Sequence, residues 1–150
     1  MMDSLRDLRE ALPGRFGERI RIEESDYAKR GFSLDIAASA ADIEDAAGLM
    51  DSLGFTLESL SAIDWPAEGA MELVYDFNGM AGGGRVAIRV RVPREAPELP
   101  SISSIFGGAN WYEREAREMF GIVFTGHPNL IPLVLPEDAV FHPLRKDDAA

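Results

Sequence analysis

Hydrophobic residues recur along the chain at spacings that predict its helices and strands. Leucines near the start follow the helical spacing of three and four residues: Leu5, Leu8 and Leu12. Ser4 or Asp3 is placed to cap this helix, and Pro13 with Gly14 is expected to end it. The pattern predicts a short first helix at the periphery of the fold.

Five later stretches predict strands, because hydrophobic and polar residues alternate along them. They are residues 19–24, 32–36, 55–64, 71–77 and 85–92, of which 55–64 has the most mixed pattern. The last two predict a hairpin, since Asn78-Gly79 and Gly82-Gly83-Gly84 are residues that turns need. Acidic residues on its first strand and arginines on its second suit cross-strand ion pairs.

Residues 39–53 carry the clearest helical pattern. Their apolar side chains fall on one stripe: Ile43, Ala46, Ala47, Met50 and Leu53. Ser39 is expected to cap this helix, with Asp42 completing a weak capping box and Gly54 closing the helix.

A last helix is predicted from Asn110 as N-cap to Gly121 as its stop, with Glu113 completing a capping box. An extended connection with three prolines and a helical turn at residues 101–106 precede it. One side of the helix is apolar: Tyr112, Ala116, Met119 and Phe120. The opposite side is expected to be ionic, with i,i+4 pairs: Glu113 with Arg117, and Arg114 with Glu118.

Residues 126–150 combine closely spaced prolines with many apolar residues. The prolines, at 128, 132, 136 and 143, disfavour both helices and central strands. The apolar residues are unlike a disordered tail: Leu130, Ile131, Leu133, Val134, Leu135, Val140, Phe141 and Leu144. An irregular segment of this kind predicts an arm that lies on another protein.

The order of these elements predicts an α+β fold with a small mixed or antiparallel sheet, helices packed on one side and an irregular proline-rich C-terminal arm. We expect residues 1–125 to form the α+β domain and residues 126–150 to form the extended, partner-binding arm.

Composition narrows the possible partners. The net charge of −11 and the pI near 4.6 argue against nucleic acid and anionic membranes, even for the arginine-bearing hairpin strand. The absence of cysteine excludes disulfides and thiolate ligation of zinc or iron–sulfur clusters. No apolar run approaches the ~20 residues of a membrane span, and the charged start does not resemble a signal peptide. A cytoplasmic location, with membrane association only through partners, is expected.

Candidate catalytic and metal-binding groups gather near the last helix, but their spacing does not suit either role. The candidates are Glu113, Glu115, Glu118, His127 and His142. Neither histidine sits at a helical offset from a carboxylate, and both precede proline, which favours a structural or interface role. Asp35 and Asp64 are interpreted as paired or surface groups. We expect no catalytic, cofactor-binding or metal site in this chain; a stand-alone enzyme that uses the helix carboxylates is the contrasting hypothesis.

The mixed-charge run Arg145, Lys146 and Asp147 fits either a solubilising tail or ionic docking. Its attachment to the apolar arm favours docking.

Residues 100–148 closely resemble the signature of the 30 kDa subunit (the C subunit) of respiratory NADH-quinone oxidoreductase, complex I. The resemblance rests on WYEREAREMFGIVFTGHPNL followed by LPEDAVFHPLRKDD, in which ERE, MFGI, GHP, PED and PLRKD appear in the family order. It implies a cofactor-free structural subunit of the hydrophilic arm, bound to the quinone-site subunit (the D subunit), which is related to the large subunit of [NiFe] hydrogenases. Iron–sulfur clusters and a flavin or nickel–iron centre are then expected in partner subunits, and the complex on the cytoplasmic side of the membrane.

The motif match also implies which positions lie in or beside the contact with the quinone-site subunit. They are Glu113, Arg114, Glu115, Phe120, Gly121, His127, Pro128, Glu137, Asp138, Pro143, Leu144, Arg145, Lys146 and Asp147.

The sequence departs from the family pattern at a few positions. Glu118 and Asn129 stand where the family usually has Asp, and the Ile131–Leu133 region lacks the usual paired arginines. Loss of two cations removes partners for carboxylates on a neighbouring subunit. The equivalent subunit of an energy-converting membrane-bound hydrogenase is therefore the alternative.

Overall fold

A five-stranded sheet forms the centre of the molecule. The computed structural model describes residues 3–80 and 84–147. The strand order is β1-β2-β5-β4-β3, and the bounds are β1 (Arg21–Glu24), β2 (Leu34–Ala38), β3 (Phe55–Trp65), β4 (Ala70–Gly79) and β5 (Arg85–Pro93). β2 and β5 pair in parallel, and the other neighbours are antiparallel. The predicted mixed sheet and the hairpin are confirmed; Gly82 and Gly83 of its turn lie outside the described residues.

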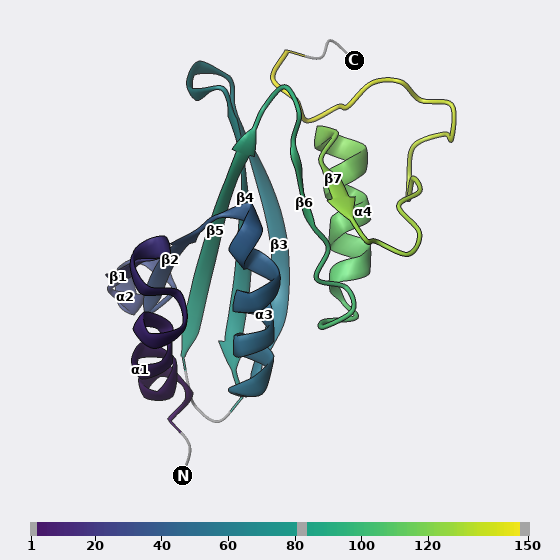
Figure 1. Ribbon diagram of the computed structural model, residues 1–150. Coiled ribbons are helices and arrows are strands. Elements are labelled where there is room, and N and C mark those ends of the chain that lie inside the picture. The colour runs from purple at the N-terminus through teal and green to yellow at the C-terminus, as the bar shows by residue number, and fades with distance from the viewer. Residues whose placement is uncertain (1–2, 81–83, 148–150) are drawn as a thin grey trace.

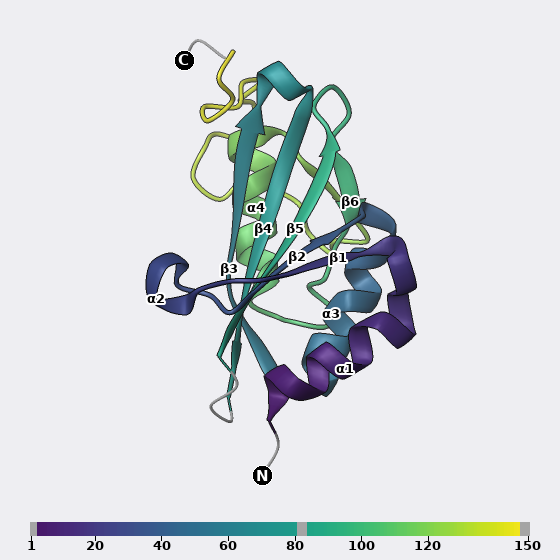
Figure 2. The ribbon, with the colours of Figure 1, turned by 90° about the vertical axis from the view of Figure 1, so that its left-hand side faces the viewer.

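Three helices pack on the same face of this sheet, as predicted: α1 (Ser4–Phe16), α3 (Ile43–Ser52) and α4 (Ala109–Phe120) (Figure 1). Figure 2 looks onto the opposite face, which these helices leave open. The one-turn helix α2 (Tyr27–Arg30) joins β1 to β2, and short 3-10 turns lie at η1 (Gly17–Arg19), η2 (Ala40–Asp42) and η3 (Pro66–Glu68).

The two sheet faces differ because side chains alternate along each strand. The covered face is apolar: Leu73, Tyr75 and Phe77 of β4 and Val86, Ile88 and Val90 of β5 are buried. On the open face Glu72 lies between Arg89 and Arg91, with N–O distances of 3.4 and 3.1 Å, and Arg89 also binds Asp35. The predicted cross-strand ion pairs are therefore present.

The first helix differs from its prediction. α1 continues through Pro13 to Phe16, and Leu8, Leu12 and Phe16 are buried in the core rather than peripheral. Burial of three large side chains at i, i+4 and i+8 outweighs the hydrogen bond that proline cannot donate, since each contributes about 1.5–3 kcal/mol. Gly17, with a φ of 59°, ends the helix instead.

The stripe predicted for residues 39–53 is buried as expected except for Leu53, which is half-buried, and the helix starts later. η2 precedes α3, and Ser39 Oγ donates to the Asp42 carboxylate at 3.2 Å, so its hydroxyl does not cap the backbone. The predicted Ser39 cap and its capping box are therefore wrong.

A second, two-stranded parallel sheet was not predicted. It pairs β6 (Glu98–Pro100) with β7 (Val123–Thr125), the strands that precede and follow α4 in the sequence. Three-residue strands carry too little periodicity to be recognised, and β6 also ends in a proline. This small sheet fixes where α4 begins and where the C-terminal segment leaves the domain. Within residues 3–80 and 84–147, no helix has the length and hydropathy needed to span a membrane.

Candidate partner-binding site

The arm, described from residue 126 to residue 147, wraps around the outer side of α4. It has neither helix nor strand over these residues, and it runs from β7 past the C-terminal end of α4 to the end of the main sheet near the β5–β6 connection (Figure 1). Because the arm cannot satisfy its own backbone groups in regular structure, the contacts that order it must come from elsewhere.

Glu118 supplies the main contact between α4 and the arm. Its carboxylate accepts hydrogen bonds from the backbone N–H groups of Leu133 at 3.2 Å and Val134 at 3.0 Å, and from that of Leu135. The glutamate is buried, so the solvent-facing pair with Arg114 predicted from the sequence is wrong. A carboxylate solvated by consecutive amides holds the loop in one conformation.

The last turn of α4 uses the arm to satisfy its carbonyl groups, which lack partners within the helix. His142 Nδ1 lies 3.0 Å from the Glu118 carbonyl oxygen, and the Leu144 N–H donates to the Met119 carbonyl at 3.0 Å. Arg145 reaches the Phe120 carbonyl at 3.3 Å. The helix end and the arm therefore stabilise each other.

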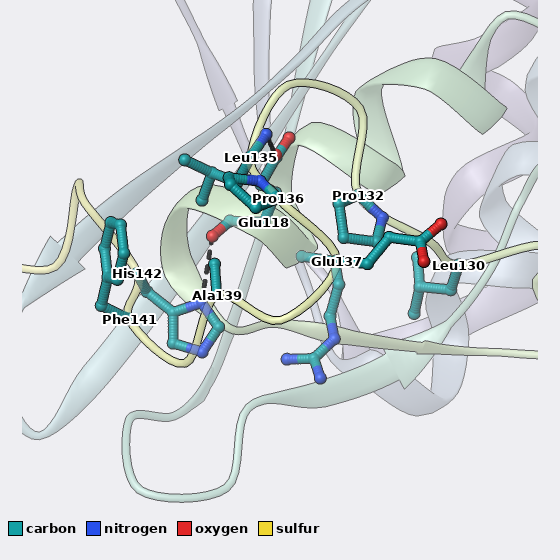
Figure 3. A pocket seen from close by; sticks show the side chains of 10 residues that line it. Glu118, Leu130, Pro132, Leu135, Pro136, Glu137, Ala139, Phe141 and His142 are labelled. Carbon is teal, nitrogen blue, oxygen red and sulfur yellow. Dashed lines mark hydrogen bonds between the residues drawn. The ribbon is translucent and has the colours of Figure 1, made fainter.

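Arg114 is also turned toward the arm. Its guanidinium donates to the backbone carbonyls of Ile131 at 3.0 Å and Pro132 at 3.1 Å. Arg117, which was predicted to pair with Glu113, instead lines a pocket of about 170 Å³ between α4 and the arm. Figure 3 shows this pocket; it is lined by Arg117, Glu118, Leu130, Pro132, Leu135, Pro136, Glu137, Ala139, Phe141 and His142.

Several apolar side chains are exposed on the outer surface of the arm. Val134 and Val140 are 80% and 93% exposed, which is unusual for side chains in an ordered segment. We call the exposed apolar residues of the arm the apolar patch: Ile131, Val134, Val140, Phe141 and Leu144. A preformed apolar surface of this kind is suited to contact with another protein.

Glu113 does not cap α4 but lies inside the domain, with an exposed fraction of 0%. Its carboxylate accepts from Ser101 Oγ at 2.6 Å and from the Ile102 N–H at 2.8 Å. Burial raises the pKa of this carboxyl group above its ordinary value. The predicted Asn110 cap and capping box are wrong, because Gly108 occupies the N-cap position and Glu113 faces the core.

His127 fixes the point where the arm leaves β7. Its Nδ1 accepts a hydrogen bond from the Asn129 N–H at 2.9 Å, so the ring proton is on Nε2 and donates to the Asn110 carbonyl at 3.2 Å. Nε2 also lies 3.9 Å from the Glu113 carboxylate. The ring therefore joins the arm to α4.

The end of the arm returns to the main sheet. Arg94 binds the carboxylate of Asp64 with both Nε, at 2.6 Å, and Nη2, at 2.8 Å. The same guanidinium binds Asp147 at 3.1 and 2.8 Å, and the Lys146 N–H donates to Asp64 at 2.8 Å. Hydrogen bonds from Arg94 lower the pKa of Asp64 and bring that of Asp147 to about 2. Asp64 and Asp35 are both paired groups.

The residues that the motif match placed in or beside a contact fall into three groups in the structure. Those with exposed side chains are Glu115, Pro128, Glu137, Asp138, Leu144, Lys146 and Asp147. Half-buried positions are Arg114, Phe120, Gly121, His127, Pro143 and Arg145, and Glu113 is buried. Their assignment to a partner contact stays a prediction.

The site also contains residues that the motif match did not select. Most of the apolar patch is among them, although the sequence had shown these residues interleaved with prolines. Glu118, Asp64 and Arg94 were not recognised as groups that hold the arm. Their partners lie 15 to 82 residues away, so no local pattern marks them.

Gly121 allows the arm to approach the end of α4. Its φ is 80°, and an added Cβ would lie 3.0 Å from the His142 ring, whereas Gly126, with a φ of 81°, has open space there. Replacing either glycine by alanine places a side chain in the left-handed region, at a cost of roughly 1–2 kcal/mol. We expect Gly121→Ala to lower the free energy of unfolding more than the matched Gly126→Ala. Urea denaturation measures both, and equal losses would show that His142 is not pressed against this position.

The donor set does not suggest a metal or cofactor site. The chain has no cysteine, and residues 3–80 and 84–147 contain no group of three or more His, Asp or Glu side chains close enough to hold a metal ion. The buried carboxylates of Glu113 and Glu118 are instead bound by backbone and hydroxyl donors of the chain itself.

Comparisons with known proteins give consistent results. The family model described as "Respiratory-chain NADH dehydrogenase, 30 Kd subunit" matches residues 36–150. The C subunit of the F(420)H(2) dehydrogenase of Methanosarcina mazei is 38% identical over 147 residues, which cover 95% of this chain and 90% of that protein. The C subunit of the NADH-quinone oxidoreductase of Moorella thermoacetica is 36% identical over 119 residues, which cover 76% of this chain and 80% of that protein.

Two solved structures share the fold. A chain of the membrane-bound sulfane sulfur reductase, an archaeal respiratory membrane complex, superimposes with a TM-score of 0.81 and 25% identity, covering 95% of this chain and 83% of that one. A trypsin-resistant fragment of Nqo5 superimposes with a TM-score of 0.65 and 28% identity, covering 82% of this chain and 98% of the fragment.

Proposed function

The chain belongs to the family of the 30 kDa subunit of respiratory-chain NADH dehydrogenase, and from this premise we propose that it is a non-catalytic structural subunit of a complex I-like NADH-quinone oxidoreductase. It acts in the hydrophilic arm of that complex, in the place of the 30 kDa subunit. It docks on the quinone-site subunit, the one related to hydrogenase large subunits, and supports electron transfer coupled to ion translocation.

The apolar patch is the observation that carries this proposal. It presents five exposed apolar side chains on a segment that α4 holds in place. Exposed apolar surface on an ordered segment is unfavourable in water unless a partner covers it. Contact with another protein of the same complex removes that surface from water.

In this proposal the redox groups belong to the partners. Iron–sulfur clusters and a flavin or nickel–iron centre are held by other subunits, since this chain lacks thiolates and its buried carboxylates are already bound. The chain contributes a binding surface and no reaction step. It lies on the cytoplasmic side of the membrane and reaches the membrane only through those subunits.

A second candidate is the equivalent subunit of an energy-converting membrane-bound [NiFe] hydrogenase. The similarity to an F(420)H(2) dehydrogenase and to a membrane-bound sulfane sulfur reductase favours it, because the fold also serves complexes with donors or acceptors other than NADH and quinone. A hydrogenase-type partner keeps the cysteine pairs that ligate nickel, and a quinone-type partner lacks them.

The two candidates are separated by recovering the tagged chain from its native cells in mild detergent. We expect mass spectrometry to identify a hydrogenase-large-subunit-like protein in the same fraction, and metal analysis to detect no nickel. Nickel in that fraction would select the hydrogenase. A chain recovered without companions would contradict both candidates.

Charge placed in the apolar patch tests the docking surface without disturbing the fold. Val134→Asp with Val140→Asp changes two highly exposed side chains, and we expect at least a roughly tenfold loss of the co-purified partner, equivalent to about 1.4 kcal/mol. Met80→Asp is the matched control, because Met80 is 72% exposed at the opposite end of β4 from the arm. If the partner co-purifies equally with the wild-type chain, with the Val134→Asp, Val140→Asp double variant and with Met80→Asp, then the partner binds outside the apolar patch.

A further inference from the structure

The run of charged residues at the end of the arm faces its own chain. Asp147 and the Lys146 backbone converge on Arg94 and Asp64, which lie at the ends of β5 and β3. The Lys146 ammonium also lies over the Trp65 ring, 5.6 Å from its centroid. The groups that the sequence motif offers for docking are therefore engaged within the same chain.

Asp64 explains why this arrangement is specific. Its side chain is fully buried, and a buried charge is stable only when charged and hydrogen-bonding partners surround it. Arg94 supplies one bidentate contact, and the Lys146 N–H completes the carboxylate's hydrogen bonds. The guanidinium uses its remaining N–H groups for Asp147, which matches the fork geometry of arginine.

We propose that Lys146 and Asp147 form an intramolecular latch with Asp64 and Arg94, and that this latch positions the apolar patch for its partner. The inference rests on the proposed function, because it assigns a role within the same docking surface. Asp64 and Arg94 are positioning residues, and they act on the partner through the arm.

The latch closes the arm into a strap that is fixed at several points. His127 holds its start, Glu118 its middle and the latch its end, with the apolar patch between these anchors. Ordering a loose segment opposes binding, because each immobilised residue loses conformational entropy. A strap ordered before the partner arrives avoids that loss at the moment of association.

The latch is tested first in the isolated full-length chain. Asp147→Ala removes the outer carboxylate, and Asp51→Ala makes the same change at an exposed position of α3, outside the positions that the motif match places in the contact. We expect the backbone amides of Leu144 and Lys146 to exchange with deuterium roughly tenfold faster in Asp147→Ala than in the control. Asp147→Glu restores the carboxylate and is expected to recover much of the protection. Identical exchange in Asp147→Ala and Asp51→Ala would overturn the latch.

The positioning role is tested in the assembled complex. Wild-type and variant chains with different tags are produced together in native cells, and their ratio in the purified complex is measured. We expect Asp147→Ala to be under-represented severalfold, while Asp51→Ala and Asp147→Glu enter at close to the wild-type level. Faster amide exchange with unchanged incorporation would overturn the positioning role.

The experiments distinguish a wrong docking surface from a wrong latch. If the Val134→Asp with Val140→Asp chain enters the complex as well as wild type does, the apolar patch is not the docking surface. The positioning role of the latch then fails with it. The exchange experiment needs no partner, so it still decides whether Asp147 closes the arm.

Discussion

Glu118→Ala is expected to release the middle of the arm and to prevent most of the chain from entering its complex. The carboxylate accepts hydrogen bonds from the N–H groups of Leu133, Val134 and Leu135. Hydrogen bonds to a charged group contribute about 1.5–3 kcal/mol each, and the amides regain part of this from water once the loop opens. A local loss of roughly 3 kcal/mol is sufficient to make the open loop the major species.

The effect is local because the core of the domain does not depend on this loop. We therefore expect hydrogen exchange to become fast at residues 133–135 while the strands of the main sheet remain protected. Incorporation into the complex is expected to fall by at least roughly tenfold, since the apolar patch no longer has one conformation.

Glu115→Ala is the matched control for this prediction. Glu115 lies on the same helix with an exposed side chain, so the variant makes the same change in composition and net charge without touching the arm. Slow exchange at residues 133–135 in Glu118→Ala would contradict the role of Glu118. Because the motif match places Glu115 in or beside the contact, this control is compared by exchange at residues 133–135, and equally fast exchange in both variants would show that loss of a carboxylate, and not of these hydrogen bonds, opens the loop.

The regular elements of the fold were predictable because their signals are local. In the β4–β5 hairpin, alternate residues face the core, and in α3 the apolar residues fall on one stripe. Both patterns are visible within a window of about ten residues. The sheet and its helix-covered face followed from such patterns, whereas the family resemblance rested on short sequence motifs.

The site was less predictable because charged side chains were expected to be exposed to solvent. In α4, Glu113 and Glu118 look like the solvent face of an amphipathic helix, yet both are buried. Their hydrogen-bond partners are backbone N–H groups of other segments, which no sequence pattern displays. The Arg94–Asp64 pair and the continuation of α1 through Pro13 were missed for the same reason. In both cases contacts between segments distant in the sequence outweighed the structure that the local sequence favours.

Glu113→Ala is expected to destabilise the whole domain by about 3 kcal/mol. The substitution leaves the Ile102 N–H without its acceptor in the interior, removes one of the hydrogen-bond partners of the Ser101 hydroxyl and opens space beside His127. Buried polar groups that lose their partner cost about 1–3 kcal/mol each. Urea denaturation followed by circular dichroism measures the change, and a loss below about 1 kcal/mol would contradict this account.

Glu113→Gln separates the hydrogen bonds of this side chain from its charge. The amide oxygen still accepts from the Ile102 N–H, and the amide nitrogen donates to Ser101 Oγ. Because burial raises the pKa of Glu113, the folded chain disfavours the ionised carboxylate. This penalty is absent well below the ordinary glutamate pKa of about 4.3 and is complete once the pH exceeds the raised value in the folded state.

The sign of the pH dependence follows from these states. Glutamine carries no charge at any pH, so Glu113→Gln should gain stability relative to wild type as the pH rises from 4 toward 8. The groups that face the carboxylate do not reverse this trend: Ser101 is uncharged, Tyr75 is buried with a raised pKa, and burial outweighs the His127 ring 3.9 Å away in setting the pKa of Glu113. Urea denaturation across this range tests the prediction, with Glu115→Gln as the control for the change in net charge. If Glu113→Gln instead loses stability relative to wild type as the pH rises, the carboxylate is stabilised as an ion inside the domain.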